Sequence, residues 1–385
     1  MDALTRDADG AWAHWRDQWE FPHGLTYLQH GAHGPPPRPV MAAWLDWIRR
    51  NESNPMEFAT RTADEHMLAA RRRLAAFVGC PVDDLAFMIN TTMGIHAVAA
   101  SLPLRAGDEV VMSNHDYGIV RRTWQRACDR AGARLVITRL PWPIRTAADV
   151  VDAYFSGVTS RTRAMVFSHV TSPTGVILPV RELCRRARAQ GLWACVDGAH
   201  GPGMLPLDIS RLDCDFYAAS CHKWLSAPPG TGFLYAHPRV QSAVQPLVVS
   251  FGVSWRDVWW CGTRDFTPFL TVPAAIDFFE TAGPDAFRQR THELARYARV
   301  RITELTGMEP VAPDSAEWYG SMASLPLPPG DVRPVHEALW KKYGFEVGLG
   351  PWEDRNLLRV SCHLYTSAAD IDRLVAALKE LGVGR

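Results

Sequence analysis

The side chains best suited to chemistry lie at the ends of apolar segments in the middle of the chain. Asp197 ends the apolar run 192–196, and Lys223 comes shortly after the run 216–220. An exposed lysine would be an ordinary surface charge. Burial between apolar neighbours would instead lower the pKa of Lys223 and free its amine as a nucleophile. The chain offers few other candidates for such an amine, since its remaining lysines are Lys341, Lys342 and Lys379.

Two more segments carry groups that bind anions. Residues 90–94, Asn-Thr-Thr-Met-Gly, follow an apolar run and open a helical pattern. Hydroxyl and backbone N–H groups at a helix start either bind phosphate or simply cap the helix. Arg359 lies within the apolar run 357–361, where it needs either a substrate carboxylate or a structural salt bridge.

Strands that alternate with helices must position these groups. Seven short β-rich runs are expected at 85–89, 109–112, 134–138, 164–169, 192–197, 216–220 and 232–235. Helical patterns separate most of them, at 93–101, 119–131, 149–157 and 180–190. This alternation predicts an α/β fold with a mostly parallel seven-stranded sheet between helices. Ligands of such sheets bind at the carboxyl ends of the strands.

The pattern changes on either side of this region. Helices are predicted at 40–50 and 65–78, after an irregular start. Beyond residue 266 we expect a long helix over 274–305, strands at 321–327 and 357–361, and helices at 332–343 and 368–381. The predicted organisation is an N-terminal segment 1–60 that contributes to a small domain and the active-site entrance, a large domain 61–265, and a small α+β domain 266–385.

Composition excludes several classes of function. Basic and acidic residues number 41 each, so nothing favours nucleic acid as a partner. No signal peptide or membrane-length apolar run is visible, and we expect a cytoplasmic protein. The eight cysteines form no CxxC pair and the histidines no HExxH motif, so no metal site is predicted. Gly201-Pro202-Gly203 lacks the third glycine of a dinucleotide loop.

The order of these motifs resembles the class V aminotransferase family of fold-type I pyridoxal 5′-phosphate (PLP) enzymes, over roughly residues 25–380. The matching segments are the Thr-Thr-Met-Gly turn, Asp197–His200, Ser220–Lys223, Gly262–Asp265 and Arg359–Ser361. The segments 27–31, 115–117 with 121–124, and 169–175 look most like the branch of isopenicillin N epimerases and C–S lyases.

The resemblance implies a role for each matching residue. Lys223 would hold PLP as a Schiff base and move the Cα proton, and Asp197 would pair with the pyridinium nitrogen. Arg359 would bind the substrate carboxylate. Thr263 would reach the phosphate of a neighbouring subunit, which implies a homodimer with its active site at the interface. The other implied cofactor contacts are Thr91, Thr92, Ser220 and His222 at the phosphate, His200 near the ring oxygen and Ser172 beside the ring.

Some assignments stay open within the resemblance. Either His115 or Tyr117 would stack on the ring; we expect His115 there and Tyr117 near the reacting carbon. Gln29 and His30 would lie in the substrate site, where Gln29 replaces the family's usual asparagine.

The expected reaction removes the Cα proton from an amino-acid external aldimine. The sequence slightly favours β-elimination of a cysteine S-conjugate, as in secondary metabolism such as antibiotic biosynthesis. The aromatic segment 255–260 would then line a pocket for the thiol substituent, unless it packs in the core or a dimer interface. Epimerisation, transamination and decarboxylation-coupled oxidative deamination use the same scaffold, and a non-catalytic binding protein is disfavoured. A persulfide mechanism is also disfavoured, because the small-domain region 317–332 contains no cysteine.

Overall fold

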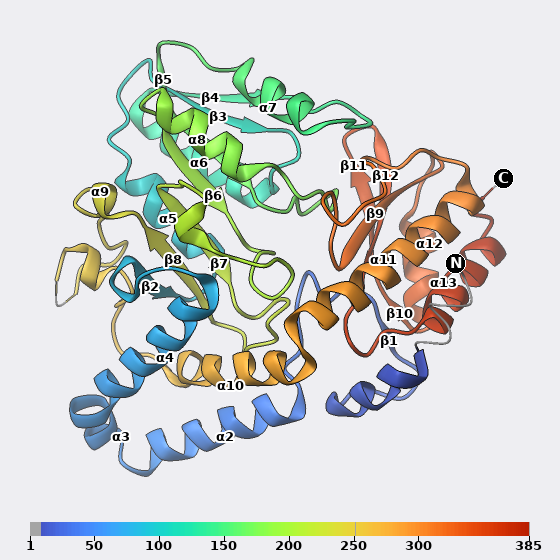
Figure 1. The fold of residues 1–385 in the computed structure, drawn as a ribbon, viewed down its shortest axis with the longest axis horizontal. Helices are drawn as coiled ribbons and strands as arrows, with labels where there is room; N and C mark the ends of the chain where they lie inside the picture. The colour runs from blue at the N-terminus through green and yellow to red at the C-terminus, as the bar shows by residue number, and fades with distance from the viewer. Residues whose placement is uncertain (1–8, 251, 385) are drawn as a thin grey trace.

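A seven-stranded sheet forms the centre of the large domain. The computed structural model describes residues 9–250 and 252–384. The strand order is β2-β8-β7-β6-β5-β3-β4, and only β8 runs antiparallel to its neighbours. The predicted mostly parallel sheet is therefore confirmed (Figure 1). Its strands are β2 (Leu85–Met88), β3 (Glu109–Ser113), β4 (Arg134–Thr138), β5 (Thr162–Ser168), β6 (Trp193–Asp197), β7 (Phe216–Ser220) and β8 (Gly232–Ala236).

Helices cover both faces of this sheet. Alternate strand residues enter two separate apolar clusters, as the two-residue period of a strand requires. Helices α5 (Thr91–Ser101) and α6 (Gly118–Ala131) pack on one cluster. Helices α4 (Ala63–Val78), α7 (Ala147–Phe155) and α8 (Val180–Ala189) pack on the other. Burial on both faces explains why the strands read as continuous apolar runs.

A second, antiparallel sheet organises the small domain. It has the order β11-β12-β9, with β9 at Met322–Leu327, β11 at Gly348–Trp352 and β12 at Arg355–Ser361. A third apolar cluster joins this sheet to its helices. The helices are α11 (Pro284–Thr306), α12 (Arg333–Lys341) and α13 (Ala368–Glu380).

The single long helix predicted for 274–305 is wrong. The structure has two helices, α10 (Thr267–Ala282) and α11, which meet at Gly283. Gly283 has φ +77°, a conformation that favours glycine, and Pro284 then starts the new helix. Helix α10 packs on α4 and on α2 (Arg38–Ser53), within the large-domain cluster. The first turn of α11 still contributes Phe287 to this cluster, and from Leu294 onward α11 packs in the small-domain cluster.

The N-terminal segment touches both domains. Strand β1 (Thr26–Tyr27) pairs in parallel with β10 (Phe345–Glu346) of the small domain, as expected, whereas α2 lies along α10 (Figure 1). The remaining short elements are η1 (Ala13–Gln18), α3 (Pro55–Glu57), η2 (Phe58–Thr62), η3 (Val82–Asp84), η4 (Ile209–Arg211), α9 (Pro238–Gln241) and η5 (Trp255–Asp257). None of the helices in the described part of the chain has the length and apolar character needed to span a bilayer.

Candidate active site

The groups singled out in the sequence meet at the carboxyl edge of the large sheet. Asp197 ends β6, and Lys223 follows its neighbour β7. Lys223 is close enough to Asp197 and to Arg359 of β12 for both charges to act on its pKa. Two domains thus bring an amine, a carboxylate and a guanidinium to one place.

Lys223 has the lowered pKa expected of a nucleophilic amine. Loss of hydration lowers it to about 8, the positive charge of Arg359 acts in the same direction, and Asp197 opposes the shift. At neutral pH this amine loses its proton more readily than a surface lysine does. The shift predicted from the apolar neighbours of Lys223 is therefore present.

His200 holds the Lys223 amine through a defined tautomer. The indole N–H of Trp224 can only donate, and it lies 3.2 Å from His200 Nδ1. Burial keeps the pKa of His200 well below its usual value, so the ring is neutral and its proton is on Nε2. Nε2 lies 3.3 Å from Lys223 Nζ, so it can donate to the amine once the amine has lost its proton. The Nε2–H group of His200 is thereby available as a hydrogen-bond donor to a cofactor atom bound next to Lys223.

Asp197 is a buried carboxylate without a cation in direct contact. Within residues 9–250 and 252–384 it forms no ion pair, and its side chain accepts one hydrogen bond, from the Ala199 amide at 3.0 Å. Burial raises the pKa of Asp197 to about 6, helped by the nearby charge of Asp116. A cationic ring nitrogen placed here would offset the free-energy cost of burying the ionised carboxylate. The site therefore fits a pyridinium.

Hydroxyl groups gather where the phosphate is expected. Thr91 begins α5, and its Oγ1 lies 2.7 Å from the Ser220 Oγ at the end of β7. Ser220 also accepts the Thr91 amide at 3.2 Å. His222 directs Nδ1 to the Thr231 carbonyl at 3.2 Å, while Thr92 is half-buried in the first turn of α5. The start of α5 and the end of β7 therefore bring the hydroxyl groups of Thr91 and Ser220 into direct contact.

His115 and Tyr117 occupy different surroundings. His115 is buried, and its Nδ1 is held by Thr174 Oγ1 at 2.9 Å. Its Nε2 is buried with no partner in the described residues, and Trp352 packs edge-on against the ring at 4.7 Å. Tyr117 is 44% exposed at the start of α6. A fixed ring with an unpaired nitrogen suits a stacking position better than the exposed phenol does.

Arg359 is surrounded by neutral acceptors only. Its Nη1 donates to the Ser172 carbonyl at 2.7 Å and to the Ser172 hydroxyl at 3.2 Å. Its Nη2 donates to Gln29 Oε1 at 3.2 Å. No carboxylate of the described residues pairs with it, although enclosure lowers its pKa. Ser172 and Gln29 thus hold the arginine in place, and a substrate carboxylate would supply the missing charge.

Two predicted site residues lie elsewhere. His30 is buried beneath the Lys223 backbone, with both ring nitrogens bonded to protein groups rather than facing a substrate. Thr263 is exposed in the loop between η5 and α10, so its contact with a neighbouring subunit stays a prediction.

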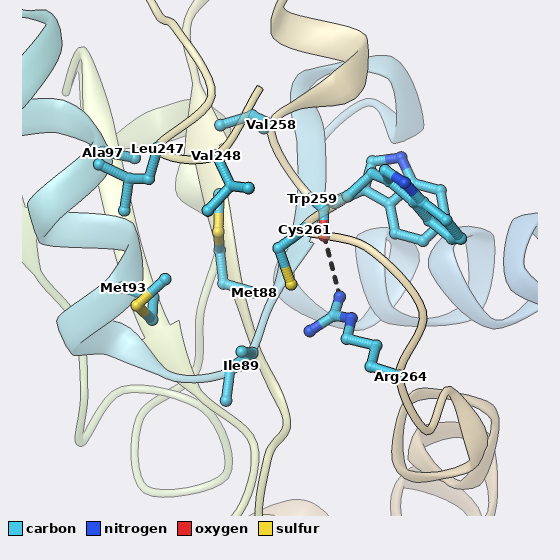
Figure 2. Close-up of a pocket in the computed structure, with 11 residues that line it drawn as sticks. Met88, Ile89, Met93, Ala97, Leu247, Val248, Val258, Trp259, Cys261 and Arg264 are labelled. Carbon is cyan, nitrogen blue, oxygen red and sulfur yellow. Dashed lines mark hydrogen bonds between the residues drawn. The ribbon is translucent and has the colours of Figure 1, made fainter. Parts of the chain in front are cut away.

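The segment 255–260 is not brought to Arg359 within this chain. Trp255 is buried, and its indole donates to the Asp83 carbonyl at 2.9 Å. Trp259 and Trp260 line a separate small pocket, whose other walls include Met88, Met93, Cys261 and Arg264. Figure 2 shows Arg264 pointing back to the Trp259 carbonyl, to which it donates at 2.9 Å. Trp259 and Trp260 thus lie beside Met88 of β2 and Met93 of α5, as the alternative of packing predicts, and a role as a thiol pocket stays a prediction.

The region expected to carry a desulfurase cysteine is not a loop over the site. Residues 322–327 form β9, paired with β12. The small-domain segment that reaches the site is the β11–β12 hairpin, where Trp352 contacts His115 and Glu353 accepts from Asn114 at 3.1 Å. This hairpin contains no cysteine, and burial raises the pKa of Cys362 to about 12. The absence of a persulfide-forming thiol thus holds for the hairpin as well.

Several supporting residues were not singled out from the sequence. Thr174 fixes His115, Trp224 fixes His200, and Tyr365 contacts His30. Thr174 and Trp224 lie inside motifs that were recognised, so only their roles were missed. Tyr365 and Trp352 carry no local signal, because their contacts are made across the domain boundary.

Comparisons with known proteins agree with this geometry. The model of the family "Aminotransferase class-V" matches residues 26–374. The isopenicillin N epimerase of Amycolatopsis lactamdurans is 37% identical, covering 96% of this chain and 98% of that protein. A probable chloroplastic L-cysteine desulfhydrase of Arabidopsis thaliana is 27% identical, covering 94% and 84%. A structure of the C-DES enzyme with glycine linked to its PLP cofactor has a TM-score of 0.82 at 22% identity, covering 92% and 96%.

The fold, the lysine–aspartate pair and the family match lead to one assignment. The buried carboxylate of Asp197, which has no cationic partner among the described residues, fits a cofactor with a protonated ring nitrogen. The chain belongs to the class-V aminotransferase family and is a PLP-dependent enzyme.

Proposed function

We propose that this enzyme removes the Cα proton of an amino acid and adds another proton on the opposite face, which makes it an amino-acid epimerase. The observation that carries this proposal is the meeting of Lys223, Asp197 and Arg359 at one sheet edge. An amine that binds the cofactor, an acid that keeps its ring charged and a guanidinium for the substrate carboxylate are the parts that Cα chemistry requires.

The large domain would hold PLP. Lys223 would bind it covalently, Asp197 would face the ring nitrogen, His200 would donate to the ring oxygen, and His115 would lie on the ring face. The phosphate would lie at the helix start, among Thr91, Thr92, Ser220 and His222. When bound, PLP withdraws electrons from Cα and so acidifies its proton. The raised pKa of Asp197 suits this role, since a more basic carboxylate binds a ring proton more firmly.

The small domain and the N-terminal segment would orient the substrate. Arg359 would bind the carboxylate through two parallel hydrogen bonds, and Gln29 and Ser172 fix the guanidinium beforehand. The lowered pKa of Lys223 lets its amine take the Cα proton near neutral pH. Tyr117, which lies near Arg359 at the exposed rim, is our candidate for the proton donor on the opposite face.

The higher identity of the epimerase relative supports our choice of epimerisation over elimination. The epimerase relative is 37% identical, against 27% for the desulfhydrase relative. The C–S β-elimination that the sequence slightly favoured remains the second candidate, supported by that lyase relative. The first steps of the two reactions are the same and only the fate of the carbanion differs.

We also propose a homodimer in which Thr263 reaches the partner's phosphate site. The loop before Thr263 exposes the apolar side chains Leu247, Val249 and Val253, which a second subunit would cover.

The test is a set of incubations of the holoenzyme with amino acids in D₂O. The set contains L- and D-amino acids with long polar side chains and S-alkyl cysteines. We expect deuterium at Cα by mass spectrometry and both enantiomers by chiral chromatography, without keto acid. Release of pyruvate and thiol from S-alkyl cysteines would replace epimerisation by elimination. A holoenzyme that exchanges no Cα proton in any of them would contradict both.

A further inference from the structure

Residues 26–34 form a strap between the two domains. Its first half belongs to the small domain, since Leu28 donates to the Glu346 carbonyl and accepts from the Ser361 amide, both at 2.8 Å. Gln29 continues this pairing as a bridge to Ser361. The strap is therefore hydrogen-bonded directly to β12, the strand that carries Arg359.

The second half of the strap holds the loop of the reactive lysine. The Gly34 amide donates to the His222 carbonyl at 2.9 Å, and His30 Nε2 lies 3.0 Å from the Lys223 carbonyl. The approach is so close that a Cβ on Gly34 would lie 2.2 Å from that carbonyl oxygen. The strap and the lysine loop thus make direct backbone contact, which no larger residue at position 34 would allow.

His30 contacts Lys223 through a single defined tautomer. A carbonyl can only accept, so the proton of the ring must be on Nε2. Burial lowers the pKa of His30 to about 3, which leaves Nδ1 unprotonated. Nδ1 then accepts the hydroxyl proton of Tyr365 at 2.7 Å. The ring also stacks on His363, with centroids 3.8 Å apart, so its orientation is fixed from three sides.

Adjacent residues of the strap thus contact the Arg359 guanidinium and the backbone of Lys223. Gln29 accepts from the Arg359 guanidinium, while His30 donates to the Lys223 carbonyl. We propose that His30 is a positioning residue, which sets the orientation of Lys223 toward Cα and ties it to the arginine strand through the strap. This inference rests on the proposed function, from which the roles of Lys223 and Arg359 are taken.

Two substitutions separate this role from simple core packing. In His30→Gln, the amide nitrogen takes the place of Nε2 and keeps the bond to Lys223. In His30→Asn, the shorter amide reaches Tyr365 but not Lys223. Both are smaller than histidine and neutral, so they share the packing cost.

The variants are compared in three measurements, two on the holoenzyme and one on the apoenzyme mixed with PLP. These are the pH midpoint of the cofactor's visible absorbance, the rate at which apoenzyme and PLP form a borohydride-reducible link, and kcat. A hydrogen bond that orients a group is worth about tenfold in rate. We expect His30→Asn to slow link formation and kcat by about tenfold and to shift the absorbance midpoint. We expect His30→Gln to lie within about threefold of the wild type.

The control is His66→Asn. It changes a half-buried histidine of α4 that packs against Trp47 and Phe58. It should leave all three measurements unchanged. The positioning role is refuted if His30→Asn and His30→Gln behave alike. This includes the case in which both match the wild type and the case in which both fold but lose link-formation rate and kcat equally.

A further variant applies if both His30 substitutions prevent folding. Tyr365→Phe keeps the ring of residue 365 but removes the hydroxyl that sets the His30 tautomer. A shifted absorbance midpoint and slower link formation in Tyr365→Phe would support the inference, and wild-type values would overturn it. Failure of the wild type itself to form a reducible link at Lys223 would instead contradict the proposed function.

Discussion

The lysine half and the arginine half of the site are built differently. Lys223, His200 and Asp197 come from neighbouring strands of one sheet, and the charge on Lys223 is opposed by that on Asp197. Arg359 comes from the small domain, and it is held by Ser172 and Gln29, which are 187 and 330 positions away in sequence. Only neutral oxygens contact it. The lysine half is thus prepared for a cofactor within one domain, whereas the arginine half needs two domains and an incoming anion.

Loss of the reactive amine should have the largest effect. We expect Lys223→Ala to lower turnover at least about 1,000-fold, because both the cofactor link and the proton acceptor disappear. Steady-state rates and borohydride fixation of PLP measure this. The matched control is Lys379→Ala, an exposed lysine on α13. Full activity of Lys223→Ala would contradict the proposal that Lys223 binds the cofactor and takes the Cα proton.

A change at Asp197 should lower activity and raise stability. Asp197→Asn removes the charge opposite the ring nitrogen, for which we expect about a 100-fold loss of kcat. In the apoenzyme the folded-state pKa of Asp197 lies at about 6, above its ordinary value of 3.8. The folded state therefore binds more protons, and the wild type loses stability as pH rises between these values.

That loss gives a measurable difference. The stability of Asp197→Asn relative to the wild type should increase by about 2 kcal/mol between pH 4.5 and pH 7.5. Urea unfolding of both apoproteins at the two pH values measures it. A pH-independent difference in the free energy of unfolding would show that burial does not raise the pKa of Asp197.

The smallest of these effects is expected in the arginine half. Arg359→Lys keeps the charge but loses one of two parallel hydrogen bonds, so KM should rise about 10- to 100-fold with a smaller change in kcat. Arg333→Lys, at a surface arginine with an 88% exposed side chain, is the control. An unchanged KM would show that the substrate carboxylate binds elsewhere. The arginine half would then not be the substrate-binding half of the site.

Much of the lysine half was predictable because its information is local. Strands 192–197 and 216–220 are recognisable from their apolar runs, and successive parallel strands place Asp197 and Lys223 at one edge. The helix break at Gly283 was missed because the apolar period continues on both sides of it. The position of residues 255–260 was missed because aromatic composition does not say which apolar surface a loop will cover.

The sequence by itself determined the sheet and the cofactor class and singled out Lys223 as the proposed reactive lysine, because these depend on residue type and on spacing along neighbouring strands. Only the tertiary structure decided what surrounds Arg359, which way His30 faces and which hairpin reaches His115. Those contacts join segments that are hundreds of positions apart. Packing between the two domains selects them, and no local pattern in the sequence records that choice.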